Sequence, residues 1–405
     1  MPQSTVITGL GAVGPHGIGR DALEAALLAG RPLATATERS AGHHAVDSSR
    51  LAARVPKVDL TTWLPAAEAR RLSMPSRFAV AAARMALQDA GLTSLEGRRV
   101  AVVLATAFGS LLFTEKLIRQ ILEEGPESAQ PFYFSECVAN AAAARVAIAL
   151  EARAVNATIT QREAGPLLAL ARGAQEVSEG RADVAIAGSA DEMTELLHAL
   201  LDRFRGTARA SRLHDEAARP FDVGRDGVLA GEGASVIVIE READVQARGG
   251  RRLARVAASA AGFDPTASVS DWGEGHQGLA RVLGGGLARA GHRPDGIDLI
   301  VSGASGARRG DRLEAETLHA FWAGAPLPPV VVPKAVVGEY SGGHLASAVL
   351  AVAGAPFGRP TAFDEPDPML AIAPHDGTPL PSPRKVLVTA LAAGGSAAWA
   401  LLERP

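Results

Sequence analysis

Short apolar runs alternate with longer amphipathic segments along most of the chain. The short runs are rich in valine, isoleucine and alanine and border glycine turns, a pattern typical of buried strands. We predict strands within residues 6–13, 100–105, 155–160, 182–188, 231–240, 298–301 and 394–403. The longer segments carry apolar residues at helical spacing and predict helices over residues 20–29, 74–90, 114–124, 138–150 and 164–179. Strands that alternate with helices indicate an α/β fold with a mixed or parallel sheet covered on both faces.

Two pairs of segments resemble each other across the chain. The glycine turn and strand at 231–240 are similar to those at 394–403, and the strand at 298–301 is similar to that at 99–103. The pairs predict two copies of one βα unit, residues 1–247 and residues 252–405.

Composition narrows the possible functions. The 405 residues carry a formal net charge of −3, which favours neither a nucleic-acid nor a membrane partner. Cys137 is the single cysteine, so neither an intramolecular disulfide nor a cysteine-based zinc site is expected. The first residues do not resemble a signal peptide, and we expect a cytoplasmic location. The glycine pairs Gly9/Gly11 and Gly231/Gly233 lack the spacing of nucleotide loops, so we expect no cofactor and no metal.

An ordered set of segments resembles the β-ketoacyl synthases, the condensing enzymes of fatty-acid and polyketide synthesis. The set comprises the opening strand at 6–13, the strand at 180–188, the block RPFDVGRDGVLAGEGA at 219–234, Gly310-Asp311 with Glu314, Pro333-Lys334, and Gly394-Gly395. The resemblance spans essentially the whole chain. It implies a thiolase-like, five-layer α/β/α/β/α sandwich built from two similar halves.

The chemistry of that family requires a cysteine thiolate and two histidines. By the resemblance, the cysteine belongs on a nucleophile elbow at residues 160–165, where this chain has Glu163, or Arg162 after a one-residue shift. The first histidine belongs eight residues before Asp311, which is Gly303. The second belongs directly after Gly338, where this chain has Glu339. We therefore expect no catalytic residue at any of the three positions.

Other family positions are retained or changed. Lys334, Asp311 and Glu314 match retained residues, and we expect them to hold loops in place. The phenylalanine-rich gate loop of the family is replaced by a segment that contains Leu391, Gly394 and Gly395.

An intact scaffold with three altered catalytic positions resembles the chain-length factor, or ketosynthase β subunit. The resemblance implies a heterodimer with an active ketosynthase α subunit, fed by an acyl carrier protein with a polyketide or acyl chain. Family members dimerise through a strand edge, with helices near residues 105–150 at the interface. Phe108, Leu112 and Tyr133 are the candidates for lining the acyl tunnel. Chain-length factors more often have glutamine where this chain has Glu163.

Two alternatives stay open. Glu163 and Glu339 could form an acid/base pair in an active malonyl-carrier-protein decarboxylase or thioester hydrolase. The chain could also be a homodimeric acyl-binding scaffold protein. We interpret Cys137 as an inert thiol and His344 as an ordinary helix residue.

Overall fold

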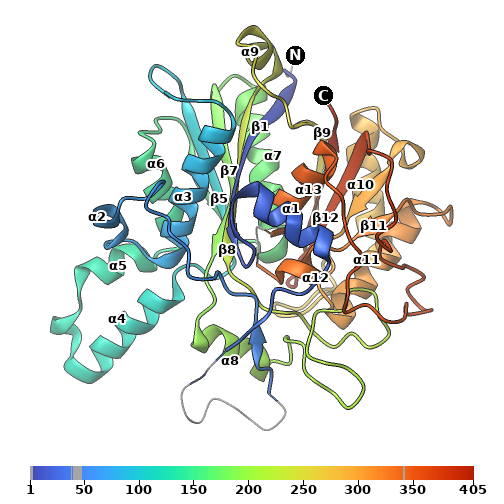
Figure 1. Cartoon of the computed structure of the whole chain (residues 1–405), viewed down its shortest axis with the longest axis horizontal. Helices are drawn as coiled ribbons and strands as arrows, with labels where there is room; N and C mark the ends of the chain where they lie inside the picture. The colour runs from blue at the N-terminus through green and yellow to red at the C-terminus, as the bar shows by residue number, and fades with distance from the viewer. Residues whose placement is uncertain (1–2, 38, 40–47, 341–342) are drawn as a thin grey trace.

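Two five-stranded units with the same strand order make up the main sheet (Figure 1). The computed structural model describes residues 3–37, 39, 48–340 and 343–405. One unit has the order β1-β8-β7-β5-β6 and the other β9-β13-β12-β10-β11, and the short β2 pairs with β1. The strands of the main sheet are β1 (Thr5–Gly14), β2 (Gly17–Ile18), β5 (Val100–Ala105), β6 (Asn156–Ile159), β7 (Val184–Asp191), β8 (Gly233–Arg241), β9 (Ala254–Phe263), β10 (Leu299–Val301), β11 (Val330–Val331), β12 (Lys385–Leu391) and β13 (Ser396–Glu403). A separate small sheet pairs β3 (Thr35–Ala36) with β4 (Leu51–Ala52).

The pairing directions repeat as well. In each unit the first three strands pair antiparallel and the last three pair parallel. The units meet through only two residue pairs between β1 and β9, Val6 with Arg255 and Ile7 with Ala254. The segments 231–240 and 394–403, which resemble each other in sequence, contain β8 and β13, at equivalent places in the two units. The division at residues 247 and 252 stays a prediction, which this repeat supports.

Helices complete the layers. Between the units lie α7 (Gly165–Ser178) and α13 (Gly343–Ala353), which contact strands of both. The outer face of the first unit is covered by α3 (Met74–Asp89) and α6 (Ala141–Ala149), and that of the second by α10 (His276–Arg289) and α11 (Arg308–Phe321). The result is the α/β/α/β/α sandwich expected from the sequence. The remaining helices are α1 (Gly19–Ala29), α2 (Ala66–Ala69), α4 (Leu111–Glu124), α5 (Pro131–Cys137), α8 (Glu195–Arg203), α9 (Glu242–Ala247) and α12 (Lys334–Val337), with 3-10 turns η1 (Pro126–Ser128), η2 (Arg162–Ala164) and η3 (Pro294–Gly296).

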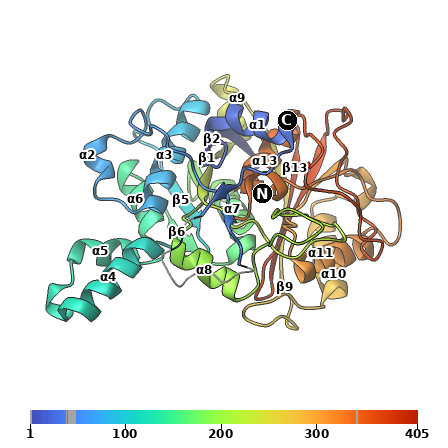
Figure 2. The same ribbon diagram turned by 60° about the horizontal axis from the view of Figure 1, so that its bottom comes forward.

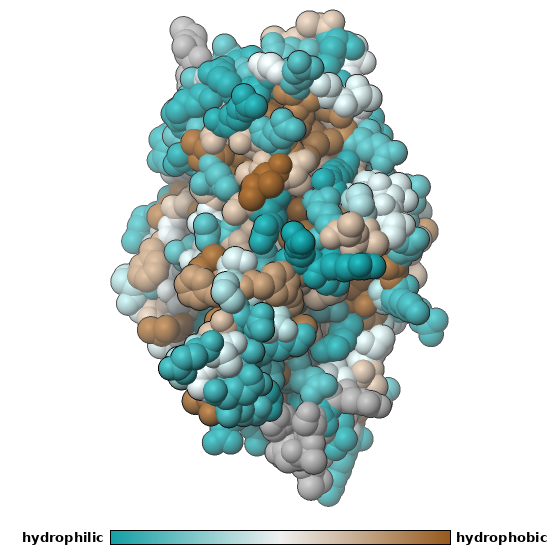
Figure 3. Space-filling view, turned by 90° about the vertical axis from the view of Figure 1, so that its left-hand side faces the viewer, coloured by the Kyte–Doolittle hydropathy of each residue, from teal (hydrophilic) through white to brown (hydrophobic). Residues whose placement is uncertain are grey.

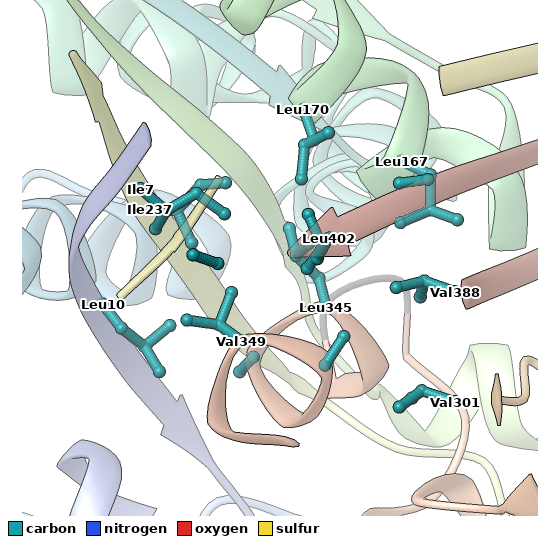
Figure 4. Close-up of a cluster of buried hydrophobic side chains, with 14 of the residues drawn as sticks. Ile7, Leu10, Leu167, Leu170, Ile237, Val301, Leu345, Val349, Val388 and Leu402 are labelled. Atoms are coloured by element: carbon teal, nitrogen blue, oxygen red, sulfur yellow. The ribbon is translucent and has the colours of Figure 1, made fainter. Parts of the chain in front are cut away.

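The main core lies around the two central helices. Figure 4 shows Leu345 and Val349 of α13 between side chains of the two units, such as Ile237 of β8 and Val388 of β12. Every residue of α13 except the last, Ala353, is buried, because a helix enclosed by the two units of the sheet has no face left for water. This explains the composition of its sequence, GHLASAVLAVA.

The glycine pair in β1 serves packing. A Cβ atom at Gly9 would lie 2.0 Å from the carbonyl oxygen of Ala86, and one at Gly11 would lie 1.9 Å from that of Ala82. Both oxygens belong to α3, so glycine is required where this helix crosses the strand.

An arm, which we define as residues 111–137 with α4 and α5, projects from the body of the protein (Figure 2). The rings of Phe113, Phe132 and Tyr133 form one cluster that joins its two helices, with centroids 5.2 to 5.5 Å apart. At the end of the arm the buried carboxylate of Glu136 accepts hydrogen bonds from the backbone and hydroxyl of Ser73. It also pairs with Arg145 at 2.6 Å.

The arm also exposes apolar side chains. Leu122 is 78% exposed and Phe134 is 65% exposed, and Ile148 on the neighbouring α6 is 68% exposed. Figure 3 views this side of the molecule, where apolar groups interrupt the polar surface. Within the described ranges, no helix has both the length and the apolar character needed to span a bilayer.

Candidate functional site

Two equivalent turns, one from each repeated unit, meet between the two units of the main sheet. In the first unit the chain passes from β6 through Glu163 in η2 into α7. In the second it passes from β11 through Lys334 and Glu339 into α13. The turns lie close together, since the charge of Glu163 acts on Glu339 and that of Lys334 acts on Glu163. The repeat therefore brings two segments about 170 residues apart into one site.

Lys334 is the cation at the centre of this site. Its side chain is fully buried, and its Nζ atom donates a 2.7 Å hydrogen bond to Oε2 of Glu339. Burial nevertheless raises the pKa of Glu339 to about 7, and repulsion from Glu163 adds to the rise. Lys334 opposes both effects by attraction. The two side chains thus form a hydrogen-bonded pair in a desolvated environment, which disfavours the ionised carboxyl, while Lys334 favours it.

Glu163 occupies the elbow. Its Oε2 atom is buried and has no hydrogen-bond partner among the described residues. Burial raises the pKa of this carboxyl, although Lys334, Arg162 and the backbone of Ala393 favour the ionised form. Arg162, the preceding residue, has a left-handed backbone with φ of 44°. The elbow thus presents a poorly solvated carboxyl group from a strained turn.

Gly303 has no room for a side chain. Its amide donates a 2.9 Å hydrogen bond to the hydroxyl of Thr389. A Cβ atom at Gly303 would lie 2.5 Å from the carbonyl oxygen of Thr389 on β12. The strand therefore occupies the space into which a residue at this position would project.

Glu314 and Asp311 lie behind the site and bind its loops. Oε1 of Glu314 accepts hydrogen bonds of 2.5 Å from the hydroxyls of Ser302 and Thr389. The carboxylate of Asp311 accepts the backbone amides of Phe221, at 2.9 Å, and of Ser305, at 3.1 Å. Burial raises the pKa of Asp311 to about 7, and the charge of Glu314 adds to the rise. These contacts join the loop after β10 to the turn at Phe221.

The gate loop packs against the segment that follows β9. The indole of Trp272 donates a 2.8 Å hydrogen bond to the carbonyl of Leu391, and the amide of Gly394 donates one of 3.2 Å to Asp271. Gly394 and Gly395 have φ of 93° and 91°, which glycine adopts without strain. The loop thus reaches Glu163 through Ala393 and is held on its other side by Trp272.

The three tunnel candidates lie in different surroundings. Phe108 is 40% exposed and lies beside the elbow, with the Arg162 guanidinium 6.0 Å from its ring centroid. Leu112 is in the first turn of α4, and its amide donates a 2.7 Å hydrogen bond to Glu192. Tyr133 packs edge-on against Phe113 within the arm. The structure therefore places Phe108 at the elbow, and it places Tyr133 in the cluster that joins α4 to α5.

Sequence reasoning missed several buried polar groups. Both ring nitrogens of His16 and of His344 are buried without a described partner. Burial lowers the pKa of His16 to about 4 and that of His344 well below its usual value, so both rings are neutral. The hydroxyl of Tyr340 is buried, and a Cβ at Gly14 would lie 2.7 Å both from it and from the ring of His16. No sequence pattern marks His16 or Tyr340, whereas His344, interpreted as an ordinary helix residue, lies buried in α13. Cys137 is half-buried at the end of α5, where its thiol contacts the carbonyl of Tyr133 at 3.0 Å.

Comparisons with known proteins agree with this architecture. A family model described as the N-terminal domain of beta-ketoacyl synthase matches residues 3–245, more than half of the chain. A relative from Streptomyces halstedii, named as a polyketide beta-ketoacyl synthase 2, is 31% identical over 382 residues, which are 93% of this chain and 89% of the relative. The solved ishigamide ketosynthase/chain length factor is 26% identical with a TM-score of 0.88 over the full length of both chains. A type II polyketide synthase ketosynthase solved with its acyl-carrier protein has the same fold, with a TM-score of 0.88, 22% identity and full coverage of both chains. The chain therefore belongs to the beta-ketoacyl synthase family.

Proposed function

We propose that the chain is a non-catalytic subunit of the chain-length-factor type, which pairs with an active ketosynthase and limits the length of the chain that the ketosynthase builds. The observation that carries the proposal is Glu163 at the elbow, inside a full-length fold of the family. The ishigamide ketosynthase/chain length factor and the Streptomyces halstedii relative support it. A cytoplasmic location belongs to the same proposal.

The chemistry of the site argues against condensation by this chain. Transfer of an acyl group from a thioester to Glu163 would give an anhydride, which lies far above the thioester in free energy. Gly303 has no side chain and no space for one, and Glu339 is bonded to Lys334. The site therefore lacks a group that could hold the acyl chain and a histidine pair that could stabilise the enolate.

A partner of the same fold fits the surface that the arm presents. β6 lies at one end of the strand order, and the arm beside it exposes Leu122 and Phe134. Exposed apolar groups of this kind mark protein interfaces. We infer that an active ketosynthase covers this surface and that an acyl carrier protein delivers the growing chain to the ketosynthase. Phe108 and Leu112 would then lie at the end of the acyl tunnel of the partner.

Product length tests the proposal. We would reconstitute the chain with an active ketosynthase and a carrier protein, and compare products of wild type and Phe108→Ala by mass spectrometry. Removal of the Phe108 ring should lengthen the products by several carbons. Phe204→Ala is the matched control, because Phe204 is also exposed and follows α8, outside the elbow, the arm and the gate loop. Full activity and unchanged product length of the ketosynthase without this chain would contradict the proposal.

The geometry also favours one alternative enough to test it. Glu339, with its pKa near 7, lies beside Glu163 and Lys334, as an acid/base pair in a decarboxylase or hydrolase would require. The isolated chain is incubated with malonyl-carrier protein, and carbon dioxide release and thioester loss are measured. Turnover that disappears in Glu163→Gln would support the enzyme. Sedimentation of the chain alone and with the ketosynthase separates the heterodimer from a homodimeric scaffold.

A further inference from the structure

We propose that two adjacent buried carboxylates, Asp191 and Glu192, are positioning residues that fix the loop carrying Phe108 and Leu112 and thereby set the length limit. The loop, residues 106–112, connects β5 to the first turn of α4. The length limit rests on the proposed function, whereas the fixing of the loop rests on contacts within this chain.

Asp191 holds the loop on both sides of Phe108. It is the last residue of β7, and its Oδ1 atom accepts hydrogen bonds of 2.8 Å from the hydroxyl of Thr106 and from the amide of Ala107. The same Thr106 hydroxyl accepts the amide of Gly109 at 3.0 Å. The residues before and after Phe108 are therefore tied, directly or through one hydroxyl, to a single carboxylate.

Glu192 holds the next segment of the loop. Its Oε1 atom accepts the amide of Leu112 at 2.7 Å. This amide lies in the first turn of α4, where backbone donors lack partners within the helix and where a negative charge is favoured by the helix dipole. Asp191 and Glu192 are 4% and 3% exposed, so both bonds are shielded from water.

Burying two adjacent carboxylates has an electrostatic cost. Burial raises the pKa of Glu192 to about 7, and repulsion from Glu232 and Asp191 adds to the rise. Glu232 lies on the other side of the group, where its oxygens accept the amides of Val55 and Met193. Arg54 is the cation that faces Glu232. The N-cap residue of α4 is Ser110, but its side chain makes no cap hydrogen bond, so Glu192 is the side chain that accepts the Leu112 amide. We infer that the two buried carboxylates serve the placement of the loop.

Placement of the loop determines where the Phe108 ring lies. The backbone on both sides of the ring is fixed by Asp191, while the ring itself faces Arg162 and is 40% exposed. A shift of the anchor is therefore transmitted to the ring, at the point where the proposed tunnel ends.

Hydrogen exchange and product length test the inference together. Asp191→Ala and Glu192→Ala remove the acceptors, whereas Asp191→Asn and Glu192→Gln keep an oxygen in the same place. Glu192→Asp shortens the side chain by one methylene and so moves the acceptor oxygen. It replaces Glu192→Ala if the alanine variant does not fold. Asp222→Asn is the matched control, because this buried carboxylate also accepts backbone amides, those of Asp364 and Glu365, but none in the loop. Exchange is measured on the isolated chain, and product length on the reconstituted pair.

In Asp191→Ala we expect the amide hydrogens of Ala107 and Gly109 to exchange about tenfold faster than in wild type. In Glu192→Ala and in Glu192→Asp we expect the same acceleration at the amide of Leu112. Products of these variants should become longer or more mixed, and the asparagine and glutamine variants should restore both readouts. Unchanged exchange overturns the inference. Faster exchange with unchanged length also overturns it, provided that Phe108→Ala changes the length. If Phe108→Ala leaves the length unchanged as well, Phe108 does not end the tunnel and the length part of this inference fails, while exchange decides whether these carboxylates hold the loop. The proposed function fails only if the ketosynthase without this chain makes products of the same length.

Discussion

The guanidinium of Arg162 lies 6.0 Å from the centroid of the Phe108 ring, so the elbow contacts the loop in front of the arm. Arg162 makes this contact from a left-handed backbone with φ of 44°. For a residue with a Cβ atom that conformation costs about 1–2 kcal/mol. The contact thus coincides with a strained residue next to Glu163.

The strain at Arg162 can be measured directly. Arg162→Gly and Arg162→Ala both lose the contact with Phe108, but only glycine adopts this φ without strain. We expect Arg162→Gly to be more stable than Arg162→Ala by about 1 kcal/mol in equilibrium denaturant unfolding. The control is Lys116 within α4, where the order should be reversed, because glycine weakens an ordinary helix by about 1 kcal/mol. Equal stability of the two Arg162 variants would show that the turn is unstrained.

Restoring the thiol should not restore condensation. Glu163→Cys supplies a nucleophile at the elbow, but Gly303 and Glu339 still provide no histidine to stabilise the enolate. Acylation of the variant is followed by mass spectrometry of the intact protein, and condensation by product analysis with malonyl-carrier protein. Condensation by Glu163→Cys alone would mean that the family positions have been assigned wrongly.

Gly303→Ala should destabilise the protein by about 1–3 kcal/mol, because the new methyl group would overlap the backbone of β12. The control is Gly278→Ala on α10, where the nearest atom to a new Cβ is the end of Arg281 at 3.9 Å. That substitution should stabilise the helix by up to about 1 kcal/mol. Thermal and denaturant unfolding of both variants measure the difference, and a neutral Gly303→Ala would contradict the steric argument.

The raised pKa of Glu339 predicts a pH dependence with a definite sign. Its folded pKa of about 7 exceeds the ordinary value of 4.5, so the folded state binds more protons than the unfolded state between these values. The contribution of Glu339 to stability therefore falls as pH rises from about 5 to about 7. In Glu339→Gln this fall is absent, so the variant should gain about 2 kcal/mol relative to wild type between pH 5 and pH 8.

The comparison with wild type is essential for this test. Burial lowers the pKa of His16 and of His198 to about 4, so both lose stability as pH falls below about 6.5, in the opposite direction. Their effect is the same in both proteins and cancels in the difference. Glu127→Gln, on the exposed turn after α4, should follow wild type. A pH-independent difference for Glu339→Gln would mean that Lys334 fully offsets burial.

Glu136 should control the attachment of the arm. Its fully buried carboxylate bonds Ser73, Ser76 and Arg145, so Glu136→Ala leaves these donors without their acceptor. We expect a loss of about 3 kcal/mol and faster proteolysis within residues 111–137. Glu123→Ala, on the exposed side of α4, is the control and should change neither quantity measurably. Unchanged proteolysis in Glu136→Ala would show that the aromatic cluster alone holds the arm.

Local pattern predicted most of the fold. The apolar run at 100–105 is β5 with the same bounds, and the amphipathic run at 74–90 is α3 to within one residue. The predicted helix at 138–150 was wrong at its start, since α5 ends at Cys137 and α6 begins at Ala141. An alanine-rich run gives no sign of that break, because it depends on Glu136 binding α3.

The candidate site could likewise be predicted from the sequence only in part. Its glutamates and lysine could be placed by family resemblance, and the structure brings them together. The contacts of Asp191 and Glu192 with the loop at 106–112 could not, because they join segments about 80 residues apart and no spacing rule connects these. The contact between Arg162 and Phe108 is of the same long-range kind.

The repeated strand order makes Glu163 and Glu339 counterparts, one from each copy of the same turn. Such a site is the fused equivalent of a symmetric dimer interface, in which both partners offer the same face. The symmetry is broken in the cations, because Lys334 is hydrogen-bonded to Glu339 in its own copy, whereas Arg162 beside Glu163 faces the Phe108 ring. Glu163 is therefore attracted by cations from both copies, Arg162 and Lys334. Changes in the two turns are therefore coupled: replacement of Lys334 alters the charge balance of both glutamates, and replacement of Glu163 removes a repulsive charge from beside Glu339.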